Sequence, residues 1–177
     1  MHTQNYESVA AVSGDADDIA ALARHYGPTA FRAAWRVLGS RAASEDVQQQ
    51  VFLRLLESPP REVESWPAYL TTVATRLAID HLRRQRRWKL LAPLWKADEP
   101  DDSPAEDAER AEASRFMREA LARLNPRDAS CFVMRHLHGL APAAIGAALG
   151  ISENHVSVSV HRARKALEAL QTKEQNR

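Results

Sequence analysis

The stretch AYLTTVATRLAIDHLRRQRR, residues 68–87, organises this 177-residue chain. Its apolar side chains recur at helical spacing, which predicts a helix with one inward face: Leu70, Val73, Ala74, Leu77 and Leu82. Ser65 is placed to cap the start of this helix, and Pro67 suits its first turn, where a missing N–H costs nothing. The helix should therefore be long and packed along one side.

The end of the same helix carries a comb of guanidinium groups: Arg83, Arg84, Arg86 and Arg87. A single basic run usually marks a solvated face. Arg is also the side chain best suited to bidentate contact with phosphates and base edges. The charge distribution and the other motifs of the chain are needed to distinguish these two interpretations.

Charge is segregated along the chain although the total is nearly balanced. Lys and Arg number 24 and Asp and Glu number 23, for a formal charge of +1. Positive charge gathers in residues 83–96 and 162–165, and negative charge gathers between them in residues 98–112. Because local potential rather than net charge steers a polyanion, this pattern favours nucleic-acid binding.

Composition predicts an all-α protein, since glycine is scarce and strong helix formers abound. The single cysteine, Cys131, excludes an internal disulfide framework and fits a reducing compartment. The first residues show no basic-then-apolar signal pattern, and no apolar run is long enough to span a membrane. We therefore expect a soluble, cytoplasmic protein.

A first helical domain is expected over residues 15–96. The pattern predicts a short helix from Asp15 that ends or kinks at Gly27–Pro28, then a second helix over residues 28–38. Ser44 is expected to cap the next helix, which stops before Pro59. The final segment, WKLLAPLW at residues 88–95, either covers this domain or forms a site for a partner.

An acidic, proline-containing segment at residues 97–111 is expected to be a flexible linker. A second domain follows over residues 112–171, with a helix over residues 113–124 and another begun by Asn125 and Pro126. The fold class is thus two small helical domains joined by an acidic tether.

The second domain contains a helix-turn-helix pattern, with a tight turn at Leu149–Gly150–Ile151 and a helix capped by Ser152. Its core positions are expected at Ile145, Leu149, Ile151, Val156 and Val160. The exposed side of the second helix would present these residues to a major groove and its phosphates: Asn154, His155, Ser157, Val158, His161, Arg162, Arg164 and Lys165. Many helical hairpins share this pattern, so on its own it leaves DNA binding and simple packing open.

No motif for catalysis or cofactor binding is found. The chain has no Gly-rich phosphate loop, no CxxC pair and no nucleophile elbow. His136 and His138 are two residues apart on a helix and face different ways, so a metal site is not expected. We expect neither enzymatic activity nor a cofactor.

Taken together, the order and spacing of these motifs resemble the extracytoplasmic-function (ECF) group of bacterial RNA polymerase sigma factors. SEDVQQQVFLRLL is similar to the family's core-polymerase-binding helix, and the opening stretch is similar to its helix that melts and reads the −10 element. The segment LNPRDASCFVMRHLHGLAPAAIGAALGISENHVSVSVHRARKAL is similar to its −35-reading domain. The resemblance covers nearly everything from Ile19 to Leu170.

The resemblance implies three groups of site residues. Contacts with core RNA polymerase would fall on Asp46, Gln49, Gln50 and Phe52. Contacts with the −10 region of promoter DNA would fall on Trp66, Tyr69, Arg76, Asp80, Arg83, Arg84, Arg86 and Arg87. Contacts with the −35 region would fall on the eight helix-turn-helix residues named above. An anti-sigma factor or another regulator is a further implied partner.

Several positions depart from the family pattern. Gln48 and Gln50 stand where acidic residues are usual, Arg76 replaces Asn, Ser157 and Ser159 replace basic residues, and Gly146 replaces Ala. The alternative function is a stand-alone helix-turn-helix regulator that binds operators without polymerase. The first domain argues against it, since it shows no phospho-acceptor, ligand-pocket or dimer-heptad pattern.

Overall fold

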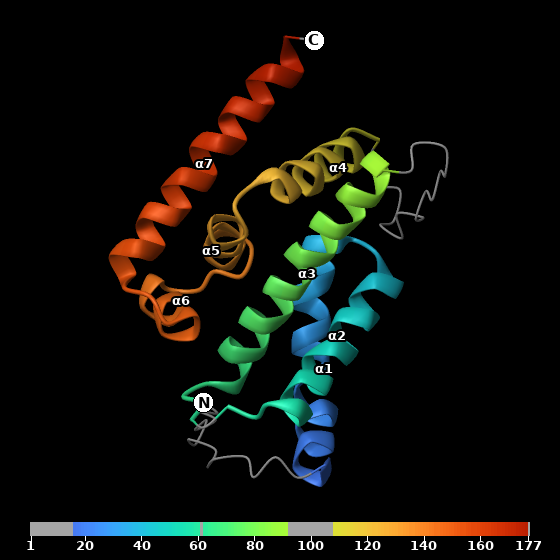
Figure 1. Cartoon of the computed structure of the whole chain (residues 1–177), viewed down its shortest axis with the longest axis vertical. Helices are drawn as coiled ribbons and strands as arrows, with labels where there is room; N and C mark the ends of the chain where they lie inside the picture. The colour runs from blue at the N-terminus through green and yellow to red at the C-terminus, as the bar shows by residue number, and fades with distance from the viewer. Residues whose placement is uncertain (1–15, 61, 92–107, 177) are drawn as a thin grey trace, which may run out of the picture.

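The computed structural model describes residues 16–60, 62–91 and 108–176, and in this part of the chain it contains seven α-helices and no strand. They are α1 (Ala16–Leu38), α2 (Arg41–Glu57), α3 (Trp66–Leu91), α4 (Ala108–Arg123), α5 (Pro126–His136), α6 (Pro142–Leu149) and α7 (Glu153–Gln175) (Figure 1). The all-helical prediction is confirmed.

Helix α1 continues through Gly27 and Pro28, so the predicted end of a first helix and start of a second one there are wrong. Pro28 removes one backbone hydrogen bond, but α1 packs along both α2 and α3, and this burial holds the helix together. Gly27 serves a close approach rather than a turn. A Cβ at this position would lie 2.7 Å from Nε2 of Gln48 on α2.

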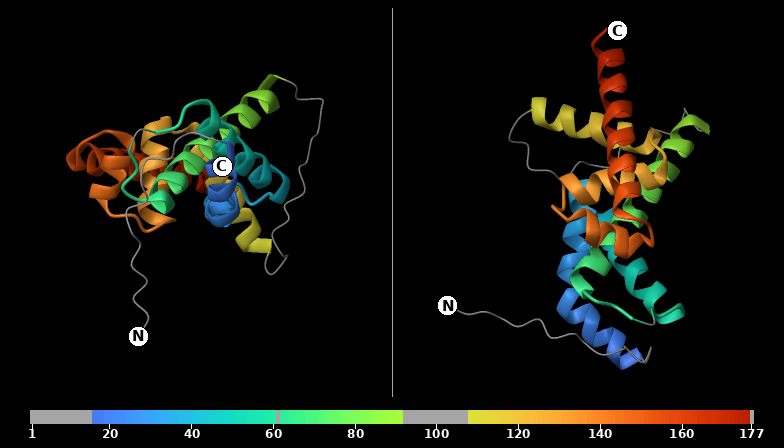
Figure 2. Two further views of the ribbon diagram at one scale, coloured as in Figure 1. Left: turned by 90° about the horizontal axis from the view of Figure 1, so that it is seen from below. Right: turned by 90° about the vertical axis from the view of Figure 1, so that its left-hand side faces the viewer.

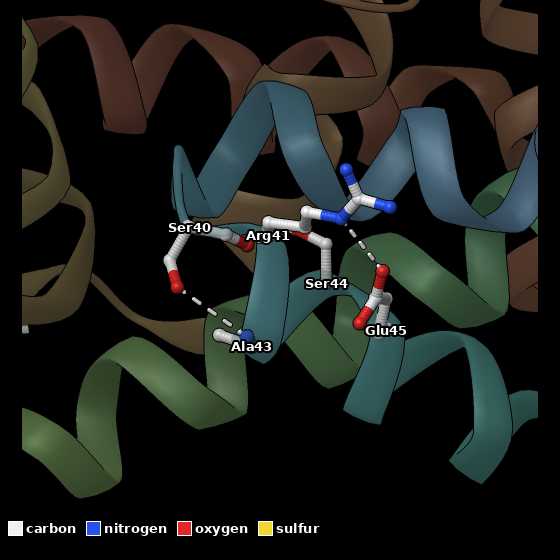
Figure 3. Close-up of polar contacts among 5 residues, drawn as sticks. All are labelled: Ser40, Arg41, Ala43, Ser44 and Glu45. Atoms are coloured by element: carbon white, nitrogen blue, oxygen red, sulfur yellow. Dashed lines mark hydrogen bonds and ion pairs between the residues drawn. The ribbon is translucent and has the colours of Figure 1, made fainter. Parts of the chain in front are cut away.

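Helix α2 is capped by Ser40 and not, as predicted, by Ser44. Gly39 has a positive φ of 65° and reverses the chain after α1, and Oγ of Ser40 then accepts a hydrogen bond from the N–H of Ala43 at 3.3 Å (Figure 3). Ser44 lies one turn further on, fully buried, and its hydroxyl donates to the carbonyl of Ser40 at 2.6 Å. On the outer side, Arg41 and Glu45 form an ion pair at 2.9 Å.

Helix α3 follows the sequence prediction closely. Ser65 caps it by accepting from the N–H of Ala68 at 3.4 Å. Four of the five predicted inward residues are buried and Val73 is half-buried against the same core. At its end, Trp88, Leu90 and Leu91 are exposed, so residues 88–91 do not cover the domain. The rest of the WKLLAPLW segment and most of the expected linker lie outside the described residues.

The second half of the chain contains the predicted helix-turn-helix. Asn125 caps α5, with Pro126 in its first turn, and α4 begins five residues before the expected Ala113. Gly150, with a φ of 65°, makes the turn from α6, and Ser152 caps α7 by accepting from the N–H of His155. Ile145 and Val156 are buried together, with Leu149, Ile151 and Val160 packed around them. The predicted core of this motif is confirmed.

The two halves lie against each other, with α3 packing on α4, α5 and α6. Apolar residues of both halves belong to one continuous core, to which the second half contributes Leu121, Leu124, Val133 and Leu167. Helix α2 and the α5–α7 group lie on opposite sides of α3 (Figures 1 and 2). The C-terminal end of α7 extends beyond this assembly (Figure 2).

Candidate nucleic-acid interface

The exposed side of α7 carries all eight residues predicted for the −35 contact. Asn154, His155, Ser157, Val158, His161, Arg162, Arg164 and Lys165 are each exposed. They occupy the N-terminal and middle turns of the helix, which is the part that a helix-turn-helix presents to a major groove. The structure therefore brings this predicted set together on one open surface.

Two local contacts orient the start of this surface. Ser152 Oγ lies 3.1 Å from Nδ1 of His155, which fixes the imidazole beside the cap. Ser157 donates its hydroxyl to the carbonyl of Glu153 at 3.1 Å, within its own helix. Further along, Arg164 lies 3.7 Å from Glu168 in an exposed pair, which is weak enough to leave the guanidinium available to phosphate.

Ser159, unlike Ser157, does not lie on this surface. It is buried at the α7–α5 contact, where its hydroxyl bonds the thiol of Cys131. Burial raises the pKa of the Cys131 thiol, and the hydrogen bond from Ser159 opposes that rise. Ser159 therefore contributes to the packing of α7 on α5. Of the two serines, only Ser157 lies on the exposed side of α7.

A second basic surface follows α3. Arg76, Asp80, Arg84 and Arg87 are exposed and recur at intervals of three or four residues, so they share one face of the helix. Two other members of the predicted −10 set lie beside this face and contact the second half of the chain. Arg83 donates from Nη1 to the carbonyl of Leu124 at 3.0 Å, and Nε of Arg86 lies 3.6 Å from a carboxylate oxygen of Glu119.

The two aromatic residues of the predicted −10 set, Trp66 and Tyr69, are placed differently from each other. Trp66 is only 4% exposed, so the ring lies in the core and not on the surface, and its buried Nε1 has no hydrogen-bond partner. Tyr69 is half-buried and meets Trp66 edge to face, with ring centroids 5.8 Å apart. Burial raises the pKa of the Tyr69 hydroxyl, and Arg76 opposes this rise. Tyr69 is thus the partly accessible member of the pair.

The predicted polymerase-binding residues lie on α2, where Asp46 and Gln49 are exposed and Gln50 is half-buried. Phe52 is 8% exposed and belongs to the core, so this residue is not on the surface as expected. The helix places Leu53 and Leu56, which are 55% and 43% exposed, on the outer face instead. Sequence inspection missed them, although three leucines at positions 53, 55 and 56 do not all fit one inward stripe.

In the described residues, no group of three or more His, Cys, Asp or Glu side chains is placed to hold a metal ion. None of the helices described is long and apolar enough to cross a membrane. The candidate site consists of exposed surfaces. Two are basic helices, one of them in the helix-turn-helix, and the third is a mixed polar and apolar strip on α2. These features define a helical DNA-binding protein with two separate contact modules.

Comparison with known proteins agrees with this class. Residues 22–88 match the family described as Sigma-70 region 2, and residues 117–167 match Sigma-70, region 4. The ECF RNA polymerase sigma factor SigL of Mycobacterium tuberculosis is 30% identical over 169 residues, which cover 90% of this chain and 94% of SigL. The chain belongs to the ECF sigma factors of the sigma-70 family.

Two further proteins are similar to the chain, one in sequence and one in fold. The ECF RNA polymerase sigma factor BldN of Streptomyces coelicolor is 28% identical over 165 residues, which cover 90% of this chain and 62% of BldN. The chain thus spans about three-fifths of the length of that relative. The sigma factor RpoE of Bartonella quintana, solved with the anti-sigma factor NepR, has a similar fold, with a TM-score of 0.53 at 17% identity over 88% of this chain and 98% of RpoE.

Proposed function

We propose that this protein binds core RNA polymerase, recognises promoter DNA and directs transcription initiation. The observation that carries the proposal is the presence of two exposed basic helices on one chain, on α3 and α7, together with a separate strip on α2. A DNA-binding module alone needs one such helix. Two DNA-binding helices, α3 and α7, together with a polymerase-binding strip on α2, are what a factor needs in order to position an enzyme at two separate stretches of one promoter.

The residue roles follow from these surfaces. Residues 15–96 form the module for polymerase and the −10 element, residues 97–111 form the tether, and residues 112–171 form the −35 reader. On α2, Asp46, Gln49 and Gln50 meet the polymerase together with Leu53 and Leu56, and the buried Phe52 supports them from below. On α7 the open face meets the major groove and its flanking phosphates.

Strand separation in this proposal needs no catalytic group. It requires only that the protein binds unstacked single strand more tightly than duplex, so that binding shifts the equilibrium towards the melted form. Stacking of a base on an aromatic ring contributes about 1–3 kcal/mol. Tyr69 supplies the ring that is already partly exposed, and Trp66 buttresses it from the core. The protein acts in the cytoplasm by binding alone, and an anti-sigma protein is a proposed regulator.

Run-off transcription with core polymerase and genomic promoter fragments tests the proposal. Defined transcripts are expected only when the protein and core are both present. A gel shift provides the contrast, because a stand-alone regulator binds duplex without core, whereas this protein should require core for stable promoter complexes. Absence of transcripts at every site, with specific duplex binding by the free protein, would contradict the proposal.

A further inference from the structure

The last turn of α3 is exposed on every side. Each residue from Arg87 to Leu91 is exposed, although a helix of a folded domain usually keeps one face against the core. Three of these residues are large and apolar. Trp88 is 70% exposed, Leu90 65% and Leu91 79%, more than any other large apolar side chain in the described part of the chain. Both views of Figure 2 show this end of α3 at the edge of the molecule. A cluster of this kind indicates an interaction surface.

The proposed function leaves this cluster without a partner. The polymerase-binding strip lies on α2, and the contacts proposed for α3 come from polar and aromatic side chains. Leucine has no flat ring on which a base could stack, and an apolar side chain gains nothing from a phosphate. Leu90 and Leu91 therefore indicate a partner that is itself apolar.

The same end of α3 is strongly cationic. Arg84, Arg87 and Lys89 are exposed beside the apolar cluster, and residues 81–97 of the sequence contain no acidic side chain. Cations near the C-terminus of a helix interact favourably with its macrodipole, which explains part of this pattern. The macrodipole does not explain why the cations are interleaved with exposed apolar side chains. The partner should therefore be both apolar and anionic.

The directions of the three apolar side chains favour a fluid partner over a rigid one. At about 100° per residue, Trp88, Leu90 and Leu91 spread over about 160° of the helix surface. A groove in a protein usually accepts one stripe of a helix, and the cores of protein interfaces are poor in lysine. The boundary of a lipid bilayer adapts to side chains that spread in this way. Tryptophan is enriched there, and basic side chains extend from it to the headgroups.

We propose that the end of α3, residues 84–91, binds the surface of an anionic lipid bilayer. The three apolar side chains enter the boundary between headgroups and acyl chains, and Arg84, Arg87 and Lys89 lie against the anionic headgroups. This binding is separate from the proposed function and does not depend on it. Because Arg84 and Arg87 cannot contact headgroups and promoter phosphates at the same time, bound bilayer and bound promoter DNA exclude each other.

Co-sedimentation of the full-length protein with vesicles tests the electrostatic part of the proposal. The protein should bind vesicles of phosphatidylglycerol mixed equally with phosphatidylcholine, and it should bind phosphatidylcholine alone at least about tenfold more weakly. Lys89→Gln changes a residue outside the proposed DNA contacts. It should lower the partition coefficient on the anionic vesicles about fivefold, the usual effect of one basic residue near such a surface. Equal binding to both kinds of vesicle, or binding to neither, would overturn the proposal.

Charge alone attracts many basic proteins to anionic vesicles, so the apolar side chains need a test of their own. The triple variant Trp88→Ser, Leu90→Ser, Leu91→Ser keeps every cation and should lower the partition coefficient at least about tenfold. Leu53→Ser with Leu56→Ser is the matched control, because these leucines are exposed on α2, and it should bind vesicles as the wild-type protein does. Since all five positions are exposed, the urea midpoints of both variants should stay close to the wild-type value. Wild-type vesicle binding by the triple variant would overturn the proposal.

The depth of Trp88 in the bilayer provides a measurement that is independent of affinity. Bromine on the acyl chains quenches the fluorescence of a tryptophan that enters the bilayer. At equal fractions of bound protein, brominated vesicles should quench the wild-type protein more than Trp88→Phe, which keeps an apolar ring at this position. The other tryptophans are present in both proteins, so their contribution cancels in the comparison. Equal quenching would place Trp88 outside the bilayer and would overturn the proposal.

A different occupant of this surface would give a different pattern of results. The triple serine variant is therefore also assayed for affinity to core polymerase and for run-off transcription. Loss of vesicle binding with both of these unchanged supports the bilayer. Unchanged vesicle binding with weaker promoter complexes would assign the surface to DNA, and unchanged vesicle binding with weaker core binding would assign it to the polymerase. Either of these two results would overturn the proposal.

Discussion

Gly146 and Ile151 lie so close across the helix-turn-helix that a Cβ on the glycine would be 2.6 Å from the carbonyl oxygen of Ile151. The backbone joins the same two residues, since the N–H of Ile151 donates to the carbonyl of Gly146 at 3.0 Å. The turn therefore folds back onto α6 at a position where only hydrogen fits. The glycine that departs from the family pattern is explained by this contact.

Gly146→Ala should lower the free energy of unfolding by about 1–3 kcal/mol, because a rigid backbone oxygen has to move. Gly27→Ala is the matched change in another helix. There the Cβ would lie 2.7 Å from Nε2 of Gln48, the far end of a flexible side chain that can rotate away. Alanine at position 27 should be neutral or stabilise by up to about 1 kcal/mol. Chemical denaturation of the two variants measures the contrast, and equal effects would contradict the distinction.

The second prediction concerns the contribution of Ser40, which caps α2, to the stability of the protein. Ser40→Ala removes the acceptor for the N–H of Ala43 and should cost about 1 kcal/mol of stability. Ser44→Ala should cost less, because the carbonyl of Ser40 keeps its bond from the backbone N–H of Ser44 at 3.0 Å. Urea titrations of both variants provide the comparison. A larger loss of stability in Ser44→Ala than in Ser40→Ala would indicate that Ser44, as predicted from the sequence, caps α2.

The local signals in this sequence were sufficient for most of the fold. Ser65, Asn125 and Ser152 cap the helices that they were predicted to cap, and the turn at Gly150 with its apolar neighbours fixes the helix-turn-helix. Ser40 and Ser44 are both serines one helical turn apart, so local chemistry did not separate them. The positive φ of Gly39 decided the matter by ending α1 where it does.

Features that depend on distant partners were beyond local patterns. The cost of Pro28 within α1 is met by packing on two other helices, which no window of sequence contains. Phe52 and Trp66 were assigned to the surface, but tertiary packing draws both large rings into the core. The hydrogen bond from Arg83 to Leu124 joins residues 41 positions apart, and only the folded chain reveals it.

His138 predicts a dependence of stability on pH. Burial, with a smaller effect of the Arg36 guanidinium, lowers the pKa of this imidazole from 6.5 to about 4. Because the folded pKa is depressed, the neutral ring is favoured by folding, and this contribution is complete above pH 6.5 and is lost as the pH falls towards 4. The loss should not exceed about 1.4 kcal/mol per pH unit in that window, and partial exposure of the ring reduces it.

The variant His138→Gln isolates this effect, because carboxylates elsewhere titrate in the same range. The difference in the free energy of unfolding between the wild-type protein and the variant should shift in favour of the variant from pH 7 to pH 4.5. Urea denaturation at several pH values measures it. A constant difference across this range would show that His138 keeps its ordinary pKa in the folded protein.

Because Leu53 and Leu56 are exposed on α2, we predict that apolar contact contributes to the affinity for core polymerase. Leu53→Ser with Leu56→Ser should weaken the affinity for core polymerase about tenfold, since each partly exposed side chain would be buried by the partner. Stability should change by less than about 0.5 kcal/mol per site, as is usual at the surface. Leu55→Ser is the contrast, because this buried neighbour should destabilise the fold by several kcal/mol. Unchanged affinity in the double variant would remove Leu53 and Leu56 from the docking surface.

Arg83 and Arg84 are adjacent on α3 but lie in different surroundings. Arg84 is exposed, whereas Arg83 donates a hydrogen bond to the carbonyl of Leu124. In promoter complexes with core polymerase, Arg84→Ala and Arg83→Ala should each reduce the slope of log affinity against log salt by about one, the value for one lost phosphate contact. Arg32→Ala, an exposed arginine of α1, is the charge-matched control and should leave the slope unchanged. A slope that stays constant in all three variants would show that α3 does not meet the phosphate backbone.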